Sequence, residues 1–474
     1  MGMKIEIEEL KKIYKECDTF VVCSTQNQVV NYIPIVNMIK EREKRDEGVR
    51  LLNITYETKK GHKFSNSIWD ENLRGFLKKF INENKKKIYI KSGQFLFDIA
   101  VPRIYDEDDY SRAIEASITD MKSNNIIWNI TGGQRNILLT VLKLIKNKLN
   151  DKKHTIIYME GNTNRLIIGQ IEEKDCLDKE KNDFIYRELN GTYGCEELDI
   201  KLVLGLAGFK VANKKEKTKK EIEDEIKEEQ AIKFLWEYFS KQDKGREKIW
   251  VTFRQKLLEA QSKKIESNEE NDKKENGENF NEAFNYLKQE IGESQYKEDD
   301  IKTLKNIKGN NSYKLGYWLE VMLVYCLKNA IKNLEEEEER FKGYFTEIRH
   351  SVILNEQYEV NEKNENGKFC EFDVVLLTKT GQIVIFECKT GLVKSEVTKS
   401  RMYTAYAAGG VYGMPILIPP YLSYDNKREV QQGEKGVWKK MKDTRNAALR
   451  SQMPVWHLDE IEEKLKDLFD EVAL

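Results

Sequence analysis

Between residues 1 and 175, short β-branched runs alternate with helical patterns, and this alternation constrains the fold more than any other feature of the sequence. Phe20–Cys23 and Ile126–Ile130 are apolar runs of strand length, and helical periodicity follows each of them, over Val29–Lys40 and Asn136–Leu149. Strands that alternate with helices are typical of a parallel sheet covered by helices. We therefore expect a Rossmann-like N-terminal domain. Its remaining elements are a strand at Val49–Thr55, a helix at Trp69–Asn84, a strand at Lys87–Ile90, a helix at Asp109–Lys122, and a closing hairpin of Thr155–Met159 and Arg165–Gly169.

The length of the chain limits the number of domains, and its charge limits the class of partner. A chain of 474 residues is expected to form two or three domains. The net charge of −1 arises from 80 Lys+Arg against 81 Asp+Glu, which excludes a globally basic nucleic-acid binder but leaves a local basic face open. The 7 cysteines are widely spaced and form no C-x-x-C pair, so they indicate neither a disulfide framework nor a zinc site. This cysteine usage favours a reducing cytoplasm.

The sequence predicts neither a signal peptide nor a membrane-spanning helix. The N-terminal sequence MGMKIEIEELKK lacks the apolar core of a signal peptide. The uncharged stretch Met402–Tyr424 contains three glycines and three prolines, so it predicts a helix end, a buried strand and a loop, whereas a spanning helix would be more continuously apolar. We expect a soluble, cytoplasmic protein without a membrane partner.

Residues 176–310 differ in character from the N-terminal part. Leu198–Phe209 predicts a short amphipathic helix, and Ala231–Phe239 and Trp250–Leu258 are aromatic-rich and helical. Lys263–Asn279 contains a single apolar residue and is expected to be a disordered linker. We interpret the region as a charged helical connector that packs the two outer domains, with a winged-helix-like arrangement as the alternative.

Residues 311–474 predict a third unit with the element order αβββαβ and a mixed sheet. Its elements are a helix at Tyr313–Leu334, a strand near Tyr344–Leu354, a hairpin of Phe369–Leu377 and Gln382–Cys388 that turns at Thr380-Gly381, a helix at Ser395–Ala408, and a strand at Pro415–Pro419.

Three charged side chains interrupt the apolar strands of this hairpin. Asp373 lies on the first strand, and Glu387 and Lys389 share one face of the second because they are two residues apart. If the strands pair, the two carboxylates converge with the lysine beside them. Such a pair binds a hard divalent cation through oxygen, and the lysine can stabilise the attacking water or the pentavalent phosphate. The spacing also lets the backbone carbonyl of Cys388 face the metal; charges held harmlessly at exposed strand ends are the alternative.

The order αβββαβ with D…E-x-K on its central hairpin resembles the PD-(D/E)xK nuclease superfamily. The resemblance implies that Asp373, Glu387 and Lys389 are catalytic, with the two carboxylates and the Cys388 carbonyl on Mg²⁺ or Mn²⁺. Glu320 lies in LGYWLEVMLVYCL, where many members place a helix glutamate that orients the metal, although a surface charge on the helix is the alternative. No proline precedes Asp373, which is a minor departure. Glu371 is either a secondary ligand or a neighbour that adds negative charge.

The helix after the motif carries basic and aromatic residues, which can hold phosphates and stack on bases or can form a solvated face. They are Lys394, Lys399, Arg401, Tyr403 and Tyr406.

Two loops of the N-terminal part each follow a strand and open a helix. In an open α/β sheet, ligands bind at the carboxyl ends of strands, where helix N-termini present N–H groups to anions. A tight turn without a ligand is the alternative, and the absence of G-x-G-x-x-G argues against nicotinamide binding. A bulky residue at Gly133 is expected to weaken ligand binding. The candidate ligand residues are Ser24, Thr25, Gln26 and Asn27 in the first loop, and Thr131, Gly132, Gly133, Gln134, Arg135 and Asn136 in the second.

With these loops, the N-terminal part resembles a CARF domain, and the whole chain is similar to the CARF–PD-(D/E)xK effectors of type III CRISPR systems. The resemblance covers roughly residues 1–175 and 310–474. It implies a homodimer that binds a cyclic oligoadenylate, with tetra-adenylate favoured over hexa-adenylate, across two CARF domains and then cleaves DNA or RNA. Two alternatives stay open: a restriction or repair nuclease without a second messenger, and a ligand-sensing transcriptional regulator with an inactive nuclease fold. The intact D…E-x-K argues against the inactive fold.

Overall fold

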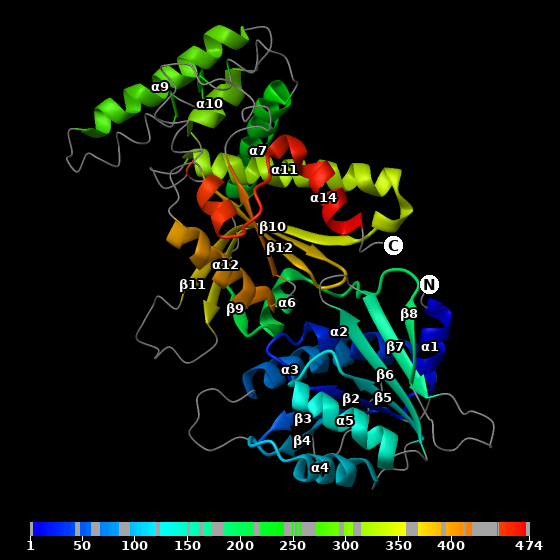
Figure 1. The fold of residues 1–474 in the computed structure, drawn as a ribbon. Coiled ribbons are helices and arrows are strands. Elements are labelled where there is room, and N and C mark those ends of the chain that lie inside the picture. The colour runs from blue at the N-terminus through cyan, green and yellow to red at the C-terminus, as the bar shows by residue number, and fades with distance from the viewer. Residues whose placement is uncertain are drawn as a thin grey trace.

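The computed structural model of the chain contains two β-sheets, one above the other, with a group of helices at the far end of the second sheet (Figure 1). The predicted strand Lys87–Ile90 and the side chain of Lys394 lie outside the residues that the structure describes. Those residues are 3–42, 48–57, 67–84, 95–119, 124–148, 152–160, 165–171, 184–212, 219–240, 249, 252–253, 256–257, 272–292, 298–306, 314–356, 368–389, 395–410, 413–419, 443 and 445–470.

The N-terminal sheet has eight strands in the order β1-β8-β7-β6-β5-β2-β3-β4. Within this order, β6, β5, β2, β3 and β4 run parallel to one another. β7 pairs antiparallel with both β6 and β8. The predicted parallel sheet with a closing β6–β7 hairpin is therefore confirmed. The strands are β1 (Lys4–Ile5), β2 (Thr19–Cys23), β3 (Arg50–Tyr56), β4 (Leu96–Val101), β5 (Asn125–Asn129), β6 (Lys153–Glu160), β7 (Arg165–Ile171) and β8 (Phe184–Leu189).

Helices cover both faces of this sheet, which explains why its central strands are largely apolar and buried. One core contains side chains of α1, α2 and α3, and the opposite core contains side chains of α4 and α5. These helices are α1 (Ile7–Glu16), α2 (Val29–Glu41), α3 (Ser67–Glu83), α4 (Glu107–Thr119) and α5 (Arg135–Lys148).

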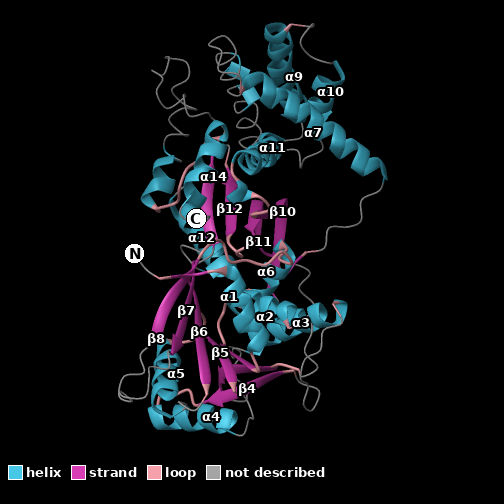
Figure 2. Cartoon of the chain, turned by 90° about the vertical axis from the view of Figure 1, so that its right-hand side faces the viewer, coloured by secondary structure: helices cyan, strands magenta, loops and turns pink. Residues whose placement is uncertain are grey.

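Helix α2 lies between the two sheets (Figures 1 and 2). Ten of its 13 residues are buried, as expected for a helix that is apolar all round. Its side chains Val29 and Ile33 belong to the same apolar core as Val375, Leu377 and Ile383 of the second sheet. The two sheets therefore share a continuous core through α2.

The second sheet has the strand order β13-β12-β11-β10-β9, and its chain order confirms the predicted αβββαβ unit. Its first strand, β9, follows α6 closely, so the helix predicted over Leu198–Phe209 ends earlier and the chain continues as a strand. Residues that we expected to connect the sheets thus add β8 to the first and β9 to the second. The elements are α6 (Ile200–Leu206), β9 (Phe209–Val211), α11 (Lys314–Glu337), β10 (Phe345–Glu356), β11 (Lys368–Thr378), β12 (Ile383–Cys388), α12 (Ser395–Gly409), β13 (Gly413–Ile418) and α14 (Ile461–Asp470).

The helical group packs on α11 through an aromatic cluster of Phe253, Phe284 and Trp318. It comprises α7 (Lys219–Phe239), α9 (Asp272–Ile291) and α10 (Glu298–Asn306), and no strand that could form a wing is described among these residues. Residues 272–279, which fall within the expected linker Lys263–Asn279, form the first turns of α9, and the disorder expected for this segment stays a prediction. Within the described ranges, none of the helices is both long and apolar enough to cross a bilayer.

Candidate active site and ligand loops

The hairpin of β11 and β12 brings the predicted catalytic side chains together. The strands pair antiparallel with Val374 opposite Phe386 and Val375 opposite Ile385, and this register places Asp373 opposite Glu387. The Asp373 Oδ2 atom accepts a hydrogen bond of 2.7 Å from the backbone N–H of Cys388. The predicted convergence of the two carboxylates is therefore seen in the structure.

The ammonium group of Lys389 lies against both carboxylates. Its Nζ atom is 3.7 Å from Asp373 Oδ2 and forms a close ion pair with Glu387 Oε1. Burial lowers the pKa of Lys389, but the charges of Glu387 and Asp373 outweigh burial and hold this pKa above its ordinary value. Lys389 therefore remains a cation beside the two acids.

The carboxylates of Asp373 and Glu387 are largely shielded from solvent. The side chain of Glu387 is only 3% exposed, and burial, followed by the charge of Asp373, raises its pKa. Burial also raises the pKa of Asp373, an effect that the Lys389 charge and the Cys388 N–H oppose. Buried carboxylates with raised pKa values gain most from a nearby cation, because a cation offsets both desolvation and mutual repulsion.

Glu320 reaches the same site from α11. Burial, and after it the charge of Asp373, raises the pKa of Glu320 to about 8. Its Oε2 atom accepts a hydrogen bond of 3.3 Å from the hydroxyl of Ser351 on β10. The helix glutamate expected from the sequence thus lies in the electrostatic field of the hairpin acids, to which Glu371 also adds negative charge.

Ser351 is a site residue that the sequence analysis missed. It lies between His350, which pairs with Val374, and Val352, which pairs with Phe372, so it lies across from Asp373. Its φ of 51° is unusual for a residue other than glycine. Backbone strain of this kind clusters at functional sites, and here the strained residue donates its hydroxyl to Glu320.

Arg401 of α12 completes the site. Its Nε atom is 2.9 Å from Glu387 Oε1, and its guanidinium also donates a hydrogen bond of 3.2 Å to the backbone carbonyl of Glu371. The sequence marked Arg401 only as one basic residue of a helix, because nothing in its spacing indicates which strand it meets.

The donor chemistry fits a hard divalent cation, since the acids Asp373, Glu387 and Glu320 all offer oxygen. Across the described ranges, however, no three Asp, Glu, His or Cys side chains lie close enough together to hold a metal ion. Lys389 and Arg401 supply the positive charge at Glu387 instead. The Cys388 backbone adjoins Asp373 through its N–H, and the role expected for its carbonyl stays a prediction.

The two predicted ligand loops lie side by side at the carboxyl ends of two central strands of the N-terminal sheet. They follow β2 and β5, which are neighbours, with Val22 opposite Asn129. A Cβ atom at Gly132 would lie 2.7 Å from the backbone oxygen of Cys23 and 3.0 Å from the Cγ2 atom of Thr25, so the loops touch. β3 pairs with β2 on one side and β5 pairs with β2 on the other, so the strand order changes direction at β2. Ligands bind at such topological switch points in open α/β sheets.

Buried hydrogen bonds of Asn129 and Thr131 hold the second loop in place. The Oδ1 atom of Asn129 accepts a hydrogen bond of 2.6 Å from the Thr131 hydroxyl, while its amide group donates to Asn31 Oδ1 and the Val30 carbonyl. The Thr131 hydroxyl also accepts a hydrogen bond from the Met159 N–H. Thr131 therefore holds its own loop and has little capacity left for a ligand.

Ser24 is held in the same way by Asp70, a buried residue of α3 that the sequence analysis missed. Asp70 Oδ1 accepts hydrogen bonds of 2.8 Å from Ser24 and from Gln28, and Asp70 Oδ2 accepts one of 3.1 Å from Thr55. Burial raises the pKa of Asp70 to about 6. An isolated acid on a helix face gives no sequence signal for this role.

The fully exposed side chains of the two loops are those of Gln26, Gln134 and Arg135. Gln134 Oε1 accepts a hydrogen bond of 2.6 Å from the Tyr56 hydroxyl, which also approaches Asn136. Asn27 donates a hydrogen bond of 2.9 Å to the backbone carbonyl of Gly409. The Asn27 side chain is therefore already engaged with the end of α12.

Gly133 has a structural role beside the one predicted for it. Its φ is +91°, and a Cβ atom there would lie 2.6 Å from the Cβ atom of Cys23. A bulky residue would disturb the contact between the loops even without a ligand. The predicted effect of such a substitution on ligand binding is thus not separable from an effect on folding.

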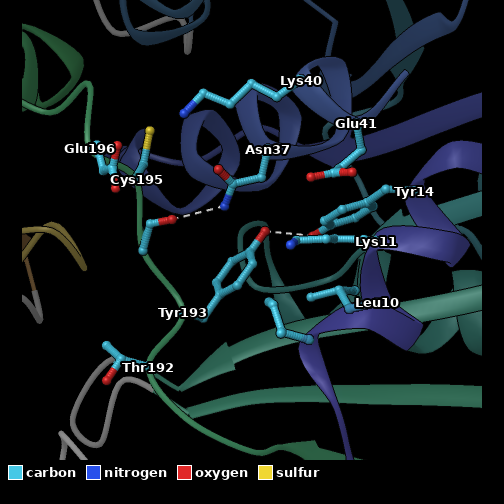
Figure 3. A pocket seen from close by; sticks show the side chains of 12 residues that line it. Leu10, Lys11, Tyr14, Asn37, Lys40, Glu41, Thr192, Tyr193, Cys195 and Glu196 are labelled. Carbon is cyan, nitrogen blue, oxygen red and sulfur yellow. Dashed lines mark hydrogen bonds between the residues drawn. The ribbon is translucent and has the colours of Figure 1, made fainter. Parts of the chain in front are cut away.

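A cavity of about 390 Å³ lies between α1, α2 and residues 192–196 (Figure 3). Its lining includes the hydrogen bond of 2.5 Å between the Tyr14 and Tyr193 hydroxyls, and Asn37 donates one of 2.9 Å to the Gly194 carbonyl. None of the predicted site residues lines it. These bonds fix the segment where the chain leaves the N-terminal sheet, and the next N–H, of Cys195, donates to the carbonyl of Lys379 in the β11–β12 turn.

No protein-family model matches the sequence, and a search of curated proteins gives no significant match. Among solved structures, the chain is similar to protein VC1899 from Vibrio cholerae, with a TM-score of 0.55 and 14% identity over 96% of this chain and 98% of that one. It is also similar to Can2 from Sulfobacillus thermosulfidooxidans, solved in complex with cyclic tetra-adenylate, with a TM-score of 0.52 and 14% identity over 97% and 99% of the two chains. Both likenesses extend over nearly the full length of each protein, so the chain shares its overall fold with VC1899 and Can2.

Proposed function

We propose that the chain is a metal-dependent nuclease activated by a cyclic oligoadenylate, of the kind that serves type III CRISPR defence. The observation that carries the proposal is the meeting of Asp373, Glu387 and Lys389 on the β11–β12 hairpin, with Glu320 beside them. In this proposal residues 311–474 form a PD-(D/E)xK nuclease domain, and residues 1–175 form a CARF domain that senses the ligand.

Each residue of the site has a role that its position supports. Asp373, Glu387 and the Cys388 carbonyl would hold Mg²⁺ or Mn²⁺, which when bound activates water and stabilises charge on the phosphate. Lys389, already placed against both acids, would orient the attacking water or stabilise the pentavalent phosphate. Glu320 would orient the groups around Asp373, and Ser351 would hold Glu320 in place.

The ligand assignment rests on the loops after β2 and β5. They lie at the switch point of the sheet, and α5 begins within the second loop at Arg135, which places a helix N-terminus, a favourable position for a phosphate, at this loop. Can2, which shares the fold, was solved with cyclic tetra-adenylate. We infer that this chain binds the same class of ligand, with tetra-adenylate favoured over hexa-adenylate.

A cyclic, symmetric ligand is best bound on a two-fold axis, where identical loops contact identical halves. We therefore propose a homodimer in which both chains contribute the loops that contain Thr25 and Gly132. Sedimentation of the full chain with and without cyclic tetra-adenylate measures this, and a monomer under both conditions would remove the shared pocket.

Cleavage of a supercoiled plasmid and of a single-stranded RNA tests the proposal. Each substrate is incubated with Mn²⁺, with and without cyclic tetra-adenylate or hexa-adenylate, beside the Glu387→Gln variant. We expect cleavage of at least one substrate that requires both Mn²⁺ and a cyclic oligoadenylate and that the variant lacks. Equal rates with and without every activator would refute ligand control, and cleavage by the variant would refute the site.

A further inference from the structure

One helix, α12, joins the first ligand loop to the candidate active site. At its C-terminal end the carbonyl of Gly409 accepts the 2.9 Å hydrogen bond from the Nδ2 atom of Asn27. The other amide atom of Asn27, Oδ1, accepts a hydrogen bond of 3.2 Å from the Val29 N–H at the start of α2. Asn27 thus ties the end of α12 to the loop after β2, although Asn27 and Gly409 are 382 residues apart.

Eight residues earlier, about 12 Å along a rigid helix, α12 carries Arg401. Arg401 contacts Glu387 Oε1 at 2.9 Å and donates to the Glu371 carbonyl on the neighbouring strand. These two contacts fix the guanidinium on the hairpin. A shift of α12 along its axis would therefore act on Arg401 and Asn27 together.

The contact at Glu387 affects how well that carboxylate can bind a cation. Glu387 is nearly inaccessible to water and already meets one cation, Lys389, so Arg401 is a second positive charge at the same oxygen. An opposite charge within about 4–6 Å stabilises a carboxylate by about one to three pKa units. A metal ion that takes Glu387 as a ligand must first replace that stabilisation.

We propose that the Arg401–Glu387 ion pair is an autoinhibitory contact, and that Asn27 holds it closed by anchoring the end of α12. The inference rests on the proposed function, because it assigns Glu387 to a metal site and the β2 loop to the activator. A ligand seated against the β2 loop would alter the Asn27 anchor, release α12 and withdraw Arg401 from Glu387. Arg401 is a positioning residue in this scheme, since it acts through Glu387.

The first test titrates Mn²⁺ into the full chain without any activator or substrate, by calorimetry. The Glu387→Gln variant identifies the heat that belongs to this site. Arg401→Gln should tighten Mn²⁺ binding by about tenfold or more, the lower end of the effect of one adjacent opposite charge. Arg401→Lys, which keeps a cation but loses the fork that reaches two acceptors, should fall between this variant and the unchanged protein.

The second test breaks the anchor at its other end. Asn27→Asp keeps the oxygen that accepts from Val29 but places an anionic oxygen against the Gly409 carbonyl. Asn37→Asp is the matched control, because Asn37 of α2 makes a hydrogen bond of the same length, 2.9 Å, to the carbonyl of Gly194 and not to α12. We expect Asn27→Asp to tighten Mn²⁺ binding severalfold, Asn37→Asp to leave it unchanged, and Asn27→Asp to add little to Arg401→Gln.

The outcomes separate this inference from the proposed function. If Mn²⁺ binding depends on Glu387 but Arg401→Gln leaves it unchanged or weaker, the ion pair is not inhibitory and the inference is wrong. If Arg401→Gln tightens binding and the two asparagine variants behave alike, α12 is not the link to the loop. If no variant binds Mn²⁺ in a Glu387-dependent way, both the metal site and the inference fail. Thermal melting of each variant confirms that it is folded, and Arg401→Lys replaces Arg401→Gln if the latter is not.

Discussion

Gly381, in the turn of the β11–β12 hairpin, packs so tightly on α2 that a Cβ atom there would lie 2.4 Å from the Cγ1 atom of Val29. The closed end of the hairpin is therefore seated on the N-terminal domain, while its open end carries Asp373 and Glu387. This arrangement links the position of the candidate active site to that of α2.

Gly381→Ala should destabilise the protein through this contact. Gly381 has a φ of +86°, and Gly343→Ala is a matched control, because Gly343 has a φ of +63° and a Cβ atom there would meet no atom of the described residues within 4 Å. Both variants incur the left-handed backbone cost of about 1–2 kcal/mol. Gly381→Ala should lose a further 1–3 kcal/mol, roughly, from overpacking, measured as the midpoint of unfolding in urea. Equal midpoints for the two variants would mean that the turn is not tightly seated.

Glu387→Gln should reduce Mn²⁺-dependent cleavage by roughly 100-fold or more, since even partners of metal ligands contribute 10- to 100-fold. Glutamine preserves the volume of this buried side chain, whereas alanine would leave a cavity beside Lys389 and Arg401. Initial rates on the better substrate give the comparison, with circular dichroism to confirm the fold. A variant with full activity would assign cleavage to other residues.

Arg135→Ala should weaken the binding of cyclic tetra-adenylate by about tenfold or more, because hydrogen bonds to charged groups contribute about 1.5–3 kcal/mol. Arg135 is exposed in the second ligand loop and begins α5. Arg112→Ala on helix α4 removes an exposed guanidinium that pairs with Asp109 and belongs to neither loop, and it should leave affinity unchanged. Fluorescence titration measures both. The same affinity for the two variants would place the phosphates elsewhere.

Asp70→Asn should change the pH dependence of stability. The pKa of Asp70 is raised by burial from 3.8 to about 6, so the folded state holds this proton more tightly than the unfolded state does. The resulting stabilisation is complete below about pH 4 and is lost as the pH rises to about 6, by about 3 kcal/mol. Asparagine does not titrate, so the stability of the unchanged protein relative to Asp70→Asn should fall between pH 4 and 6. Melting temperatures across this range measure the difference, which should be flat if Asp70 ionises normally.

The sequence was sufficient to predict the strands and helices whose patterns are local. β2, the centre of β5 and the runs Val374–Leu377 and Ile383–Phe386 of the hairpin are apolar because both of their faces are covered, and such runs can be recognised without knowledge of their neighbours. β4 was not predicted, because it is an edge strand whose exposed positions, such as Asp98, interrupt its apolar pattern.

The candidate site was predictable to the extent that its residues share one hairpin. Asp373, Glu387 and Lys389 lie within 17 positions of one another, and strand geometry alone brings them together. Arg401 reaches the site through the packing of α12, and Ser351 has a positive φ that no sequence pattern indicates. Asp70 lies on α3, far in sequence from Ser24 of the loop that it holds. No spacing rule connects such residues, so only the folded chain reveals them.

The burial of α2 on all sides limits how this architecture can be recombined. A sensor domain that ended in a solvated helix could be joined by a linker to many different effectors. Without the second sheet, residues 1–175 would expose Val29 and Ile33, and contiguous exposed apolar surface favours aggregation. Exchange of residues 311–474 for another domain would therefore require a replacement surface that covers α2 as Leu377 and Ile383 do, so the two halves are expected to be inherited together.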